Sequence, residues 1–267
     1  MKYMTFNSSC SYAGVANMLM QYGIDTDDRT IAREMKLPFL FYKEDGAYLA
    51  GPMLQSAQWF DLYLNSIGYK IVERWVEREN APKVLAQAKT AMLGLRLSSR
   101  GKHAVVYQGM DDDRFVFLNN KWKHTDEPEQ IVLSRGELLE RLDERCVIAE
   151  LQPAETEETD FRPLLEQSVR ILEELKHDLR DFCGKQHIQQ EIRAQMDSLF
   201  RAILLDAVTM LELSEKNDLA DKLRGVQREF LTAMRKEGEV TLVDEISLET
   251  LLEAIDEYAA WIAENID

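Results

Sequence analysis

Residues 103–119 read HAVVYQGMDDDRFVFLN, and this stretch decides the fold of the first half of the chain. Two runs rich in β-branched and aromatic residues flank three consecutive aspartates, a pattern that predicts a β-hairpin. We expect its strands over residues 103–109 and 114–118. His103 opens the first strand and Asn119 ends the second, so the hairpin brings a candidate general base close to a side-chain amide.

Shorter helical and strand patterns surround this hairpin within the first 150 residues. Helical patterns dominate the first part of this region, and strand patterns dominate the residues that follow. We expect helices over residues 10–21, 53–67, 82–89 and 134–142, and a short helix after residues 25–28 that contains Ile31, Ala32 and Met35. We expect strands over 69–76, 91–97 and 146–151, a turn over 98–102 and an ordered loop over 37–52. Helices followed by an antiparallel sheet predict an α+β fold.

The second half of the chain is helical in pattern throughout. Its apolar residues recur at helical spacing in four stripes, which predicts an all-α, up-down four-helix bundle. The stripes cover residues 165–182, 188–210, 219–234 and 248–262. The preceding acidic stretch has no apolar periodicity and is expected to be a linker. The sequence therefore predicts an α+β domain over 1–151, an acidic linker over 152–160 and a helical bundle over 161–267.

Charge is distributed unevenly over the 267 residues, whose net charge is −16. Residues 1–150 contain 19 Lys and Arg against 21 Asp and Glu, so the remainder carries −14. A change of this size supports the domain boundary near residue 151. An acidic chain argues against nucleic-acid binding, which needs a basic face.

Cysteine usage and hydropathy indicate the compartment. The three cysteines are far apart and odd in number, with no Cys-x-x-Cys pair, so neither a disulfide framework nor a metal site is expected. No stretch has the length of a membrane span, and the N-terminus lacks the order of a signal peptide. We therefore expect a cytoplasmic protein that does not associate with a membrane and has no bound metal or cofactor.

Three residues form a candidate catalytic constellation. Cys10 begins a predicted helix, where the helix dipole favours a thiolate. His103 can serve as its base, and Asn119 can accept a hydrogen bond from the imidazole and fix its tautomer. Asn120 competes with Asn119 for this role, and strand alternation together with the spacing from His103 favours Asn119.

The order of Cys at a helix start, then His and Asn on neighbouring strands, resembles papain-like enzymes. The block from His103 to Asn119 is similar to that of the bacteriocin-processing (double-glycine) peptidase superfamily. The segment NSSCSYAGVANMLMQYG (residues 7–23) and the aromatic stretch LPFLFY (residues 37–42) most resemble the acyltransferase family of butirosin biosynthesis. This resemblance covers residues 5–150 and implies a papain-like fold.

The resemblance implies that Cys10 accepts an acyl group as a thioester. The donor would be a phosphopantetheine-linked acyl carrier protein or a small acyl thioester, and the acceptor an amine. Papain-like enzymes usually place a Gln about six residues before the Cys. Met4 stands there, so Asn7 is the nearest amide for an oxyanion hole, together with the Cys10 N–H.

A substrate site and two alternative functions follow from the same residues. Aromatic side chains could line an acyl pocket, and these are Phe39, Phe41, Tyr42 and Tyr48. The acidic bundle could attract a cationic amine acceptor, and the sequence allows a homodimer.

The sequence and the resemblance together predict a thiol acyltransferase of antibiotic or other specialised biosynthesis. The alternatives are a cysteine peptidase or amidase on a small peptide, and an inactive papain-fold interaction module.

Overall fold

The computed structural model describes residues 1–98 and 101–266, so Ser99 and Arg100 of the predicted turn lie outside the described residues. The chain folds as two compact units. One contains residues 1–35 and 55–159 and is called the sheet unit. The other contains residues 36–54 and the chain from residue 160, and is called the helical unit.

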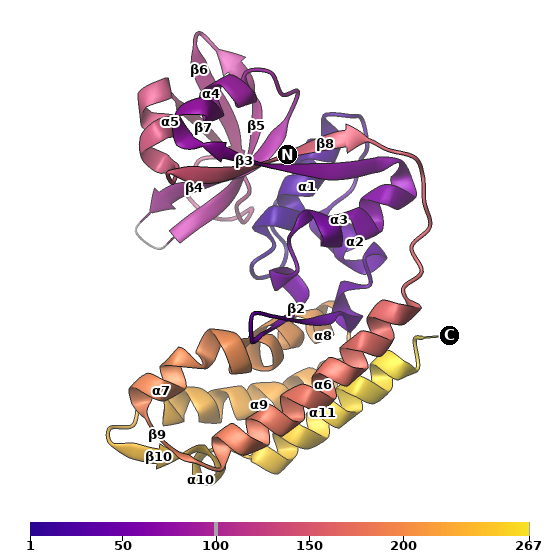
Figure 1. Cartoon of the computed structure of the whole chain (residues 1–267), viewed down its shortest axis with the longest axis vertical. Helices are drawn as coiled ribbons and strands as arrows, with labels where there is room; N and C mark the ends of the chain where they lie inside the picture. Colours follow the sequence, from indigo (N-terminus) through magenta and orange to yellow (C-terminus); the bar gives the residue numbers. More distant parts are fainter. Residues whose placement is uncertain (99–100, 267) are drawn as a thin grey trace. The chain divides into compact units, whose positions relative to one another are not determined.

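A six-stranded antiparallel sheet organises the sheet unit, in the order β3-β8-β4-β5-β6-β7 (Figure 1). The strands are β3 (Tyr69–Glu77), β4 (Ala91–Ser98), β5 (Gly101–Asp111), β6 (Arg114–Asn119), β7 (Gln130–Leu133) and β8 (Arg145–Pro153). The predicted hairpin and the α+β arrangement of this half are confirmed. Strand β7 was not predicted, because four residues are too few to show a clear alternation.

Helices cover both faces of this sheet. They are α1 (Cys10–Met20), α2 (Asp28–Glu34), α3 (Ala57–Leu64), α4 (Ala81–Leu85) and α5 (Arg135–Arg141). The main apolar core lies between α4, α5 and one face of the sheet, and it includes Leu93, Val105 and Phe117. Helix α1 packs on the opposite face, against β4 and β5.

A glycine allows α1 to approach the sheet closely. A Cβ atom at Gly14 would lie 2.5 Å from Met92 Sδ and 2.8 Å from Asn120 Nδ2, both too short for a real contact. Met92 alternates with the core residue Leu93 and therefore points to the α1 side of β4. The small residue thus sets the distance between the helix that begins at Cys10 and the sheet.

The segment predicted as a loop over residues 37–52 is a β-hairpin instead. Strand β1 (Phe41–Glu44) pairs with β2 (Ala47–Ala50) between two short 3₁₀ turns. Asp45 and Gly46 form the tight turn with φ of 49° and 81°. Asp-Gly is the preferred pair for a type I′ turn, which demands positive φ at both positions, so the signal was present in the sequence.

This hairpin belongs to the helical unit, which changes the expected domain boundaries. The Ser168 hydroxyl accepts a hydrogen bond from the Phe41 N–H at 2.9 Å, and the Tyr258 hydroxyl donates to the Pro38 carbonyl at 2.5 Å. The Phe41 ring contacts Tyr258 at a centroid distance of 5.1 Å. Residues 36–54 were expected in the first domain, but burial of these side chains against the helices places them in the second unit.

The rest of the helical unit contains helical segments at the four predicted positions. They are α6 (Arg162–Cys183), α7 (Gln189–Ala194) continued by α8 (Ala207–Leu213), α9 (Asn217–Ala233) and α11 (Leu248–Ala263). Two π-helical turns, Met196–Phe200 and Ala202–Asp206, join α7 to α8. A short pair of strands, β9 (Gln186–Ile188) with β10 (Glu239–Thr241), and the turn α10 (Leu242–Glu245) complete the unit. The up-down order of the helices stays a prediction.

Within the part of the chain that the structure describes, no helix combines the length and the apolar character that crossing a membrane requires.

Cleavage of the linker tests the revised boundary. A Glu-specific protease should cut at the exposed Glu155, Glu157 or Glu158. The N-terminal fragment would still carry the hairpin that packs into the helical unit, so we expect both fragments to co-elute from a native sizing column. Separation of two folded fragments without denaturant would contradict this boundary.

Candidate active site

Cys10 is the first residue of helix α1, as the sequence predicts, and its side chain is partly exposed. The first hydrogen bond of the helix runs from the Ala13 N–H to the Ser9 carbonyl at 2.9 Å. Ser9 does not cap the helix with its side chain. Cys10 therefore lies at an uncapped helix start, where main-chain N–H groups without helical partners point toward the N-terminus.

A buried aspartate fixes the turn that leads into Cys10. The Thr5 N–H, the Thr5 hydroxyl and the Ser9 hydroxyl all donate to the Asp28 carboxylate, each at 2.7 Å. Burial raises the pKa of Asp28, and these three hydrogen bonds oppose the rise. Ser8, between these anchored residues, adopts a positive φ of 60°. Asp28 was not identified from the sequence, where it directly precedes the second expected helix and shows no functional signal.

His103 lies on β5, opposite Leu95 of β4. Its Nε2 atom lies 2.7 Å from the main-chain carbonyl of Asn120. A carbonyl can only accept, so Nε2 carries the proton and Nδ1 of the neutral ring is left as the proton acceptor. This tautomer suits a general base for a thiol.

The hydrogen bond expected between the Asn119 side chain and His103 is not formed among the described residues. In this structure the partner of the His103 ring is the main-chain carbonyl of Asn120 rather than the Asn119 amide. Asn119 Nδ2 donates to the Pro128 carbonyl at 3.0 Å, and its buried Oδ1 has no partner among the described residues. Asn119 pairs with Val105, two residues from His103, so both side chains lie on the same face of the sheet, as alternation predicts.

The side chain of Asn120 points to the other face and joins the sheet to α1. Asn120 Oδ1 accepts from Asn17 Nδ2 at 3.0 Å, and Asn120 Nδ2 donates to the Ala104 carbonyl at 3.0 Å. Asn17 also exchanges two hydrogen bonds with the main chain of Lys2, at 2.7 and 2.9 Å. Asn17 and Asn120 are both fully buried. One continuous network therefore links the helix of Cys10 to the hydrogen-bond partner of His103.

The remaining predicted groups lie apart from this network. Among residues 1–98 and 101–266, no hydrogen bond joins the Cys10 thiol to His103, although α1 packs on β5. Asn7, the predicted oxyanion donor, is exposed. The Ser11 hydroxyl donates to Gln55 Oε1 at 2.7 Å, which holds a second amide beside the residue that follows Cys10. Sequence reasoning missed Gln55, which lies 45 residues downstream of Cys10.

The aromatic residues expected to line an acyl pocket have partners inside the helical unit. Phe39 contacts Trp261 at 4.5 Å between ring centroids. The Tyr48 hydroxyl donates to Asp178 at 2.6 Å and accepts from Lys43 at 2.8 Å. Tyr42 belongs to the same hairpin. These contacts fasten the hairpin to α6 and α11.

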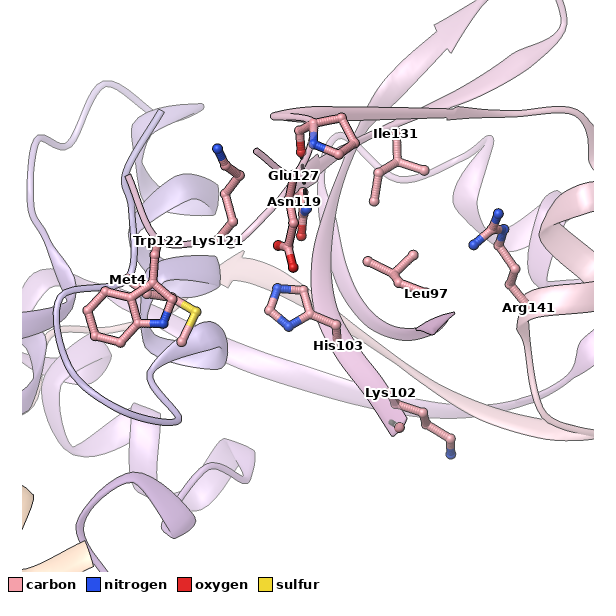
Figure 2. A pocket seen from close by; sticks show the side chains of 12 residues that line it. Met4, Leu97, Lys102, His103, Asn119, Lys121, Trp122, Glu127, Ile131 and Arg141 are labelled. Carbon is pink, nitrogen blue, oxygen red and sulfur yellow. Dashed lines mark hydrogen bonds between the residues drawn. The ribbon is translucent and has the colours of Figure 1, made fainter. Parts of the chain in front are cut away.

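A cavity of about 560 Å³ opens beside His103 within the sheet unit (Figure 2). Figure 2 shows His103, Asn119 and Glu127 directed into it from one side and Arg141 from the other. Cys10 does not line this cavity. Its lining residues are Met4, Leu97, Gly101, Lys102, His103, Asn119, Lys121, Trp122, Glu127, Pro128, Ile131 and Arg141.

Several solved structures resemble this chain. The chain resembles the crystal structure of the peptidase domain of Streptococcus ComA, a bifunctional ABC transporter involved in a quorum-sensing pathway. The TM-score is 0.38 at 9% identity, over 55% of this chain and 95% of that chain. No family model and no curated protein matches this chain. A likeness at this level defines no activity, so the chemistry rests on the residues of the site.

Alkylation with iodoacetamide at neutral pH should label Cys10 first. Burial raises the pKa of Cys146, and burial raises the pKa of Cys183 to about 12, so both react slowly as thiols. Replacement His103→Ala should slow labelling of Cys10 by about tenfold or more, because the base is lost. Peptide mass spectrometry reports each site, and denatured protein serves as the control. Equal labelling of all three cysteines in the native protein would contradict the assignment.

The replacement Asn17→Ala should also slow Cys10 labelling, by about tenfold, since it breaks the link between α1 and Asn120. It should lower the free energy of unfolding by about 1–3 kcal/mol, the cost of buried polar groups left unpaired. Ser168→Ala is the matched control, because it removes buried hydrogen bonds in the helical unit. If both variants lose stability alike and Cys10 reacts at the same rate in both, Asn17 has no positioning role.

Proposed function

We propose that the sheet unit is a thiol acyl-transfer domain, in which Cys10 carries the acyl group and His103 transfers protons. The observation that supports it most is the buried network that connects the helix of Cys10 to the hydrogen-bond partner of His103. Cys10 starts an uncapped helix, His103 has Nδ1 available as an acceptor, and the Asn17–Asn120 network fastens the helix to the partner of that imidazole. Buried polar groups need hydrogen-bond partners, and here two buried amides and a buried aspartate form such bonds around a partly exposed cysteine.

The first half of the proposed reaction loads the enzyme. His103 Nδ1 takes the thiol proton, and the Cys10 sulfur attacks the carbonyl carbon of an acyl thioester, forming a carbon–sulfur bond. The main-chain N–H of Cys10 and a neighbouring amide, from Asn7 or Gln55, would stabilise the oxyanion. Collapse of the tetrahedral intermediate breaks the bond to the donor sulfur, which leaves with the proton from His103. The donor we propose is the phosphopantetheine arm of an acyl carrier protein.

The second half transfers the acyl group to an amine. The neutral amine attacks acyl-Cys10, a carbon–nitrogen bond forms, and the bond to the Cys10 sulfur breaks. His103 takes the proton that the amine loses and returns it to the Cys10 sulfur. The Glu127 carboxylate lies on the His103 side of the cavity. A carboxylate attracts ammonium groups from solution, so it would raise the local concentration of an amine and favour the amine over water as the acceptor.

An acyl thioester of N-acetylcysteamine, which copies the end of the phosphopantetheine arm, tests this proposal. Intact mass spectrometry should show one added acyl group, mapped to Cys10, when no amine is present. Putrescine should then discharge it as an amide. Cys10→Ala is the control and should show neither step.

Two other results of this experiment would each assign a different function. Release of free acid at every putrescine concentration would replace the transferase with a hydrolase or peptidase. A wild-type protein that takes up no acyl group and forms no product would identify an inactive interaction module.

A further inference from the structure

The cavity beside His103 carries opposite charges at its two ends, and this polarity specifies a ligand. At the His103 end, the Glu127 carboxylate is exposed, and it forms no ion pair with the described residues. Asn119 is 2% exposed, and its Oδ1 lacks a donor. The Asn119 Nδ2 atom is committed to the Pro128 carbonyl, so the orientation of the amide is fixed and the unpaired atom is an acceptor. Lys102 and Lys121 also line the cavity, but Lys102 pairs with Asp143 and the Lys121 Nζ atom donates to the Thr125 carbonyl. Among the described residues, the groups without a partner at the His103 end are therefore a carboxylate and an amide oxygen, which suit a ligand with N–H groups and positive charge.

The opposite end presents a guanidinium group. Arg141 donates to the Arg96 carbonyl at 3.3 Å and has no carboxylate within ion-pair distance in the described chain. The nearby Asp143 is occupied, because it pairs with both Arg96 and Lys102. Glu137, one turn earlier on α5, pairs with Arg114 at 3.7 Å. An unpaired guanidinium matches a carboxylate, which it binds in a bidentate manner.

Between these ends the wall is apolar. Leu97 and Ile131 pack against the main core of the sheet unit, and Figure 2 shows both between His103 and Arg141. A volume of about 560 Å³ falls in the usual range of small-molecule sites. The amine and the carboxylate of the best-fitting ligand are therefore separated by an apolar segment, which neither a simple diamine nor a single α-amino acid provides.

We propose that this cavity binds a short apolar peptide with free termini. Its terminal ammonium lies at Glu127 and Asn119 Oδ1, its side chains lie over Leu97 and Ile131, and its terminal carboxylate lies at Arg141. The inference rests on the proposed function for the role of this ligand: the amine held beside His103 is the acyl acceptor. The preferred acceptor is then zwitterionic, and putrescine, which lacks a carboxylate for Arg141, is a weaker acceptor that reacts at higher concentration.

Binding to the full-length Cys10→Ala variant tests the site without any chemistry. Isothermal titration calorimetry should show that leucyl-leucine or alanyl-leucine binds. N-acetyl-leucyl-leucine lacks the ammonium group and leucyl-leucine amide lacks the carboxylate. We expect each analogue to bind about tenfold more weakly than leucyl-leucine, since each loses one charge-assisted contact.

Two single variants should separate the ends of the cavity. Arg141→Gln should weaken leucyl-leucine and its N-acetyl analogue but leave the amide analogue unchanged. Glu127→Gln should weaken leucyl-leucine and the amide analogue but leave the N-acetyl analogue unchanged. Arg145→Gln is the matched control, because Arg145 pairs with Glu77 and does not line the cavity.

The proposal is overturned if neither dipeptide binds at up to about 10 mM, which is about ten times the Kd of roughly 1 mM that marks a weak site. It is also overturned if the three leucyl-leucine ligands bind equally, or if Arg141→Gln and Glu127→Gln behave like Arg145→Gln. These outcomes leave the Cys10 chemistry untouched, because the thiol is absent from the experiment. Acylation of Cys10 by a thioester with no dipeptide binding would retain the thiol function and remove this acceptor.

Discussion

Two carboxamide side chains, Asn17 from α1 and Asn120 from the end of β6, meet in the interior of the sheet unit at 3.0 Å. Both are fully buried, so an unpaired group there would lose a hydrogen bond that water could not replace. Gly14 lets the two elements approach closely enough for this contact. Any shift of α1 along the sheet breaks the pair, which makes the position of Cys10 depend on the strands that carry His103.

The main chain of Asn120 also connects this hydrogen-bonded pair to His103. The same Asn120 whose side chain bonds Asn17 offers its carbonyl to His103 Nε2. On the other side of Cys10, Asp28 holds Thr5 and Ser9 by three hydrogen bonds. Cys10 is therefore fixed from its turn and from its helix, while the residue stays partly exposed. A rigid support around an accessible nucleophile is what acyl transfer requires.

The sequence predicted the elements that have strong local patterns. The hairpin over residues 103–119, the helix that starts at Cys10 and the helical segments of the second half are all present. Patterns that extend beyond one element were harder to interpret. The β1–β2 hairpin was missed despite its Asp-Gly turn, because its strands are short and its aromatic residues contact helices more than 100 residues away.

The candidate site shows the same limit. Cys10, His103 and Asn119 could be named from residue type and spacing, but the group that bonds His103 is a main-chain carbonyl, which leaves no trace in residue identity. Asn17 did leave a signal, as a polar residue within a helix of small and apolar residues. Asp28 and Gln55 left none, since their roles arise from tertiary contacts.

The central claim is that the Cys10 thiol and the His103 imidazole work together, and a bifunctional reagent measures this directly. 1,3-Dibromoacetone alkylates a thiol first and then a nitrogen within reach of the same three-carbon bridge. We expect one bridge per chain, which joins the peptides of Cys10 and His103 and is absent in His103→Ala. Alkylation of Cys10 alone in the wild-type protein, with no link to His103, would contradict it.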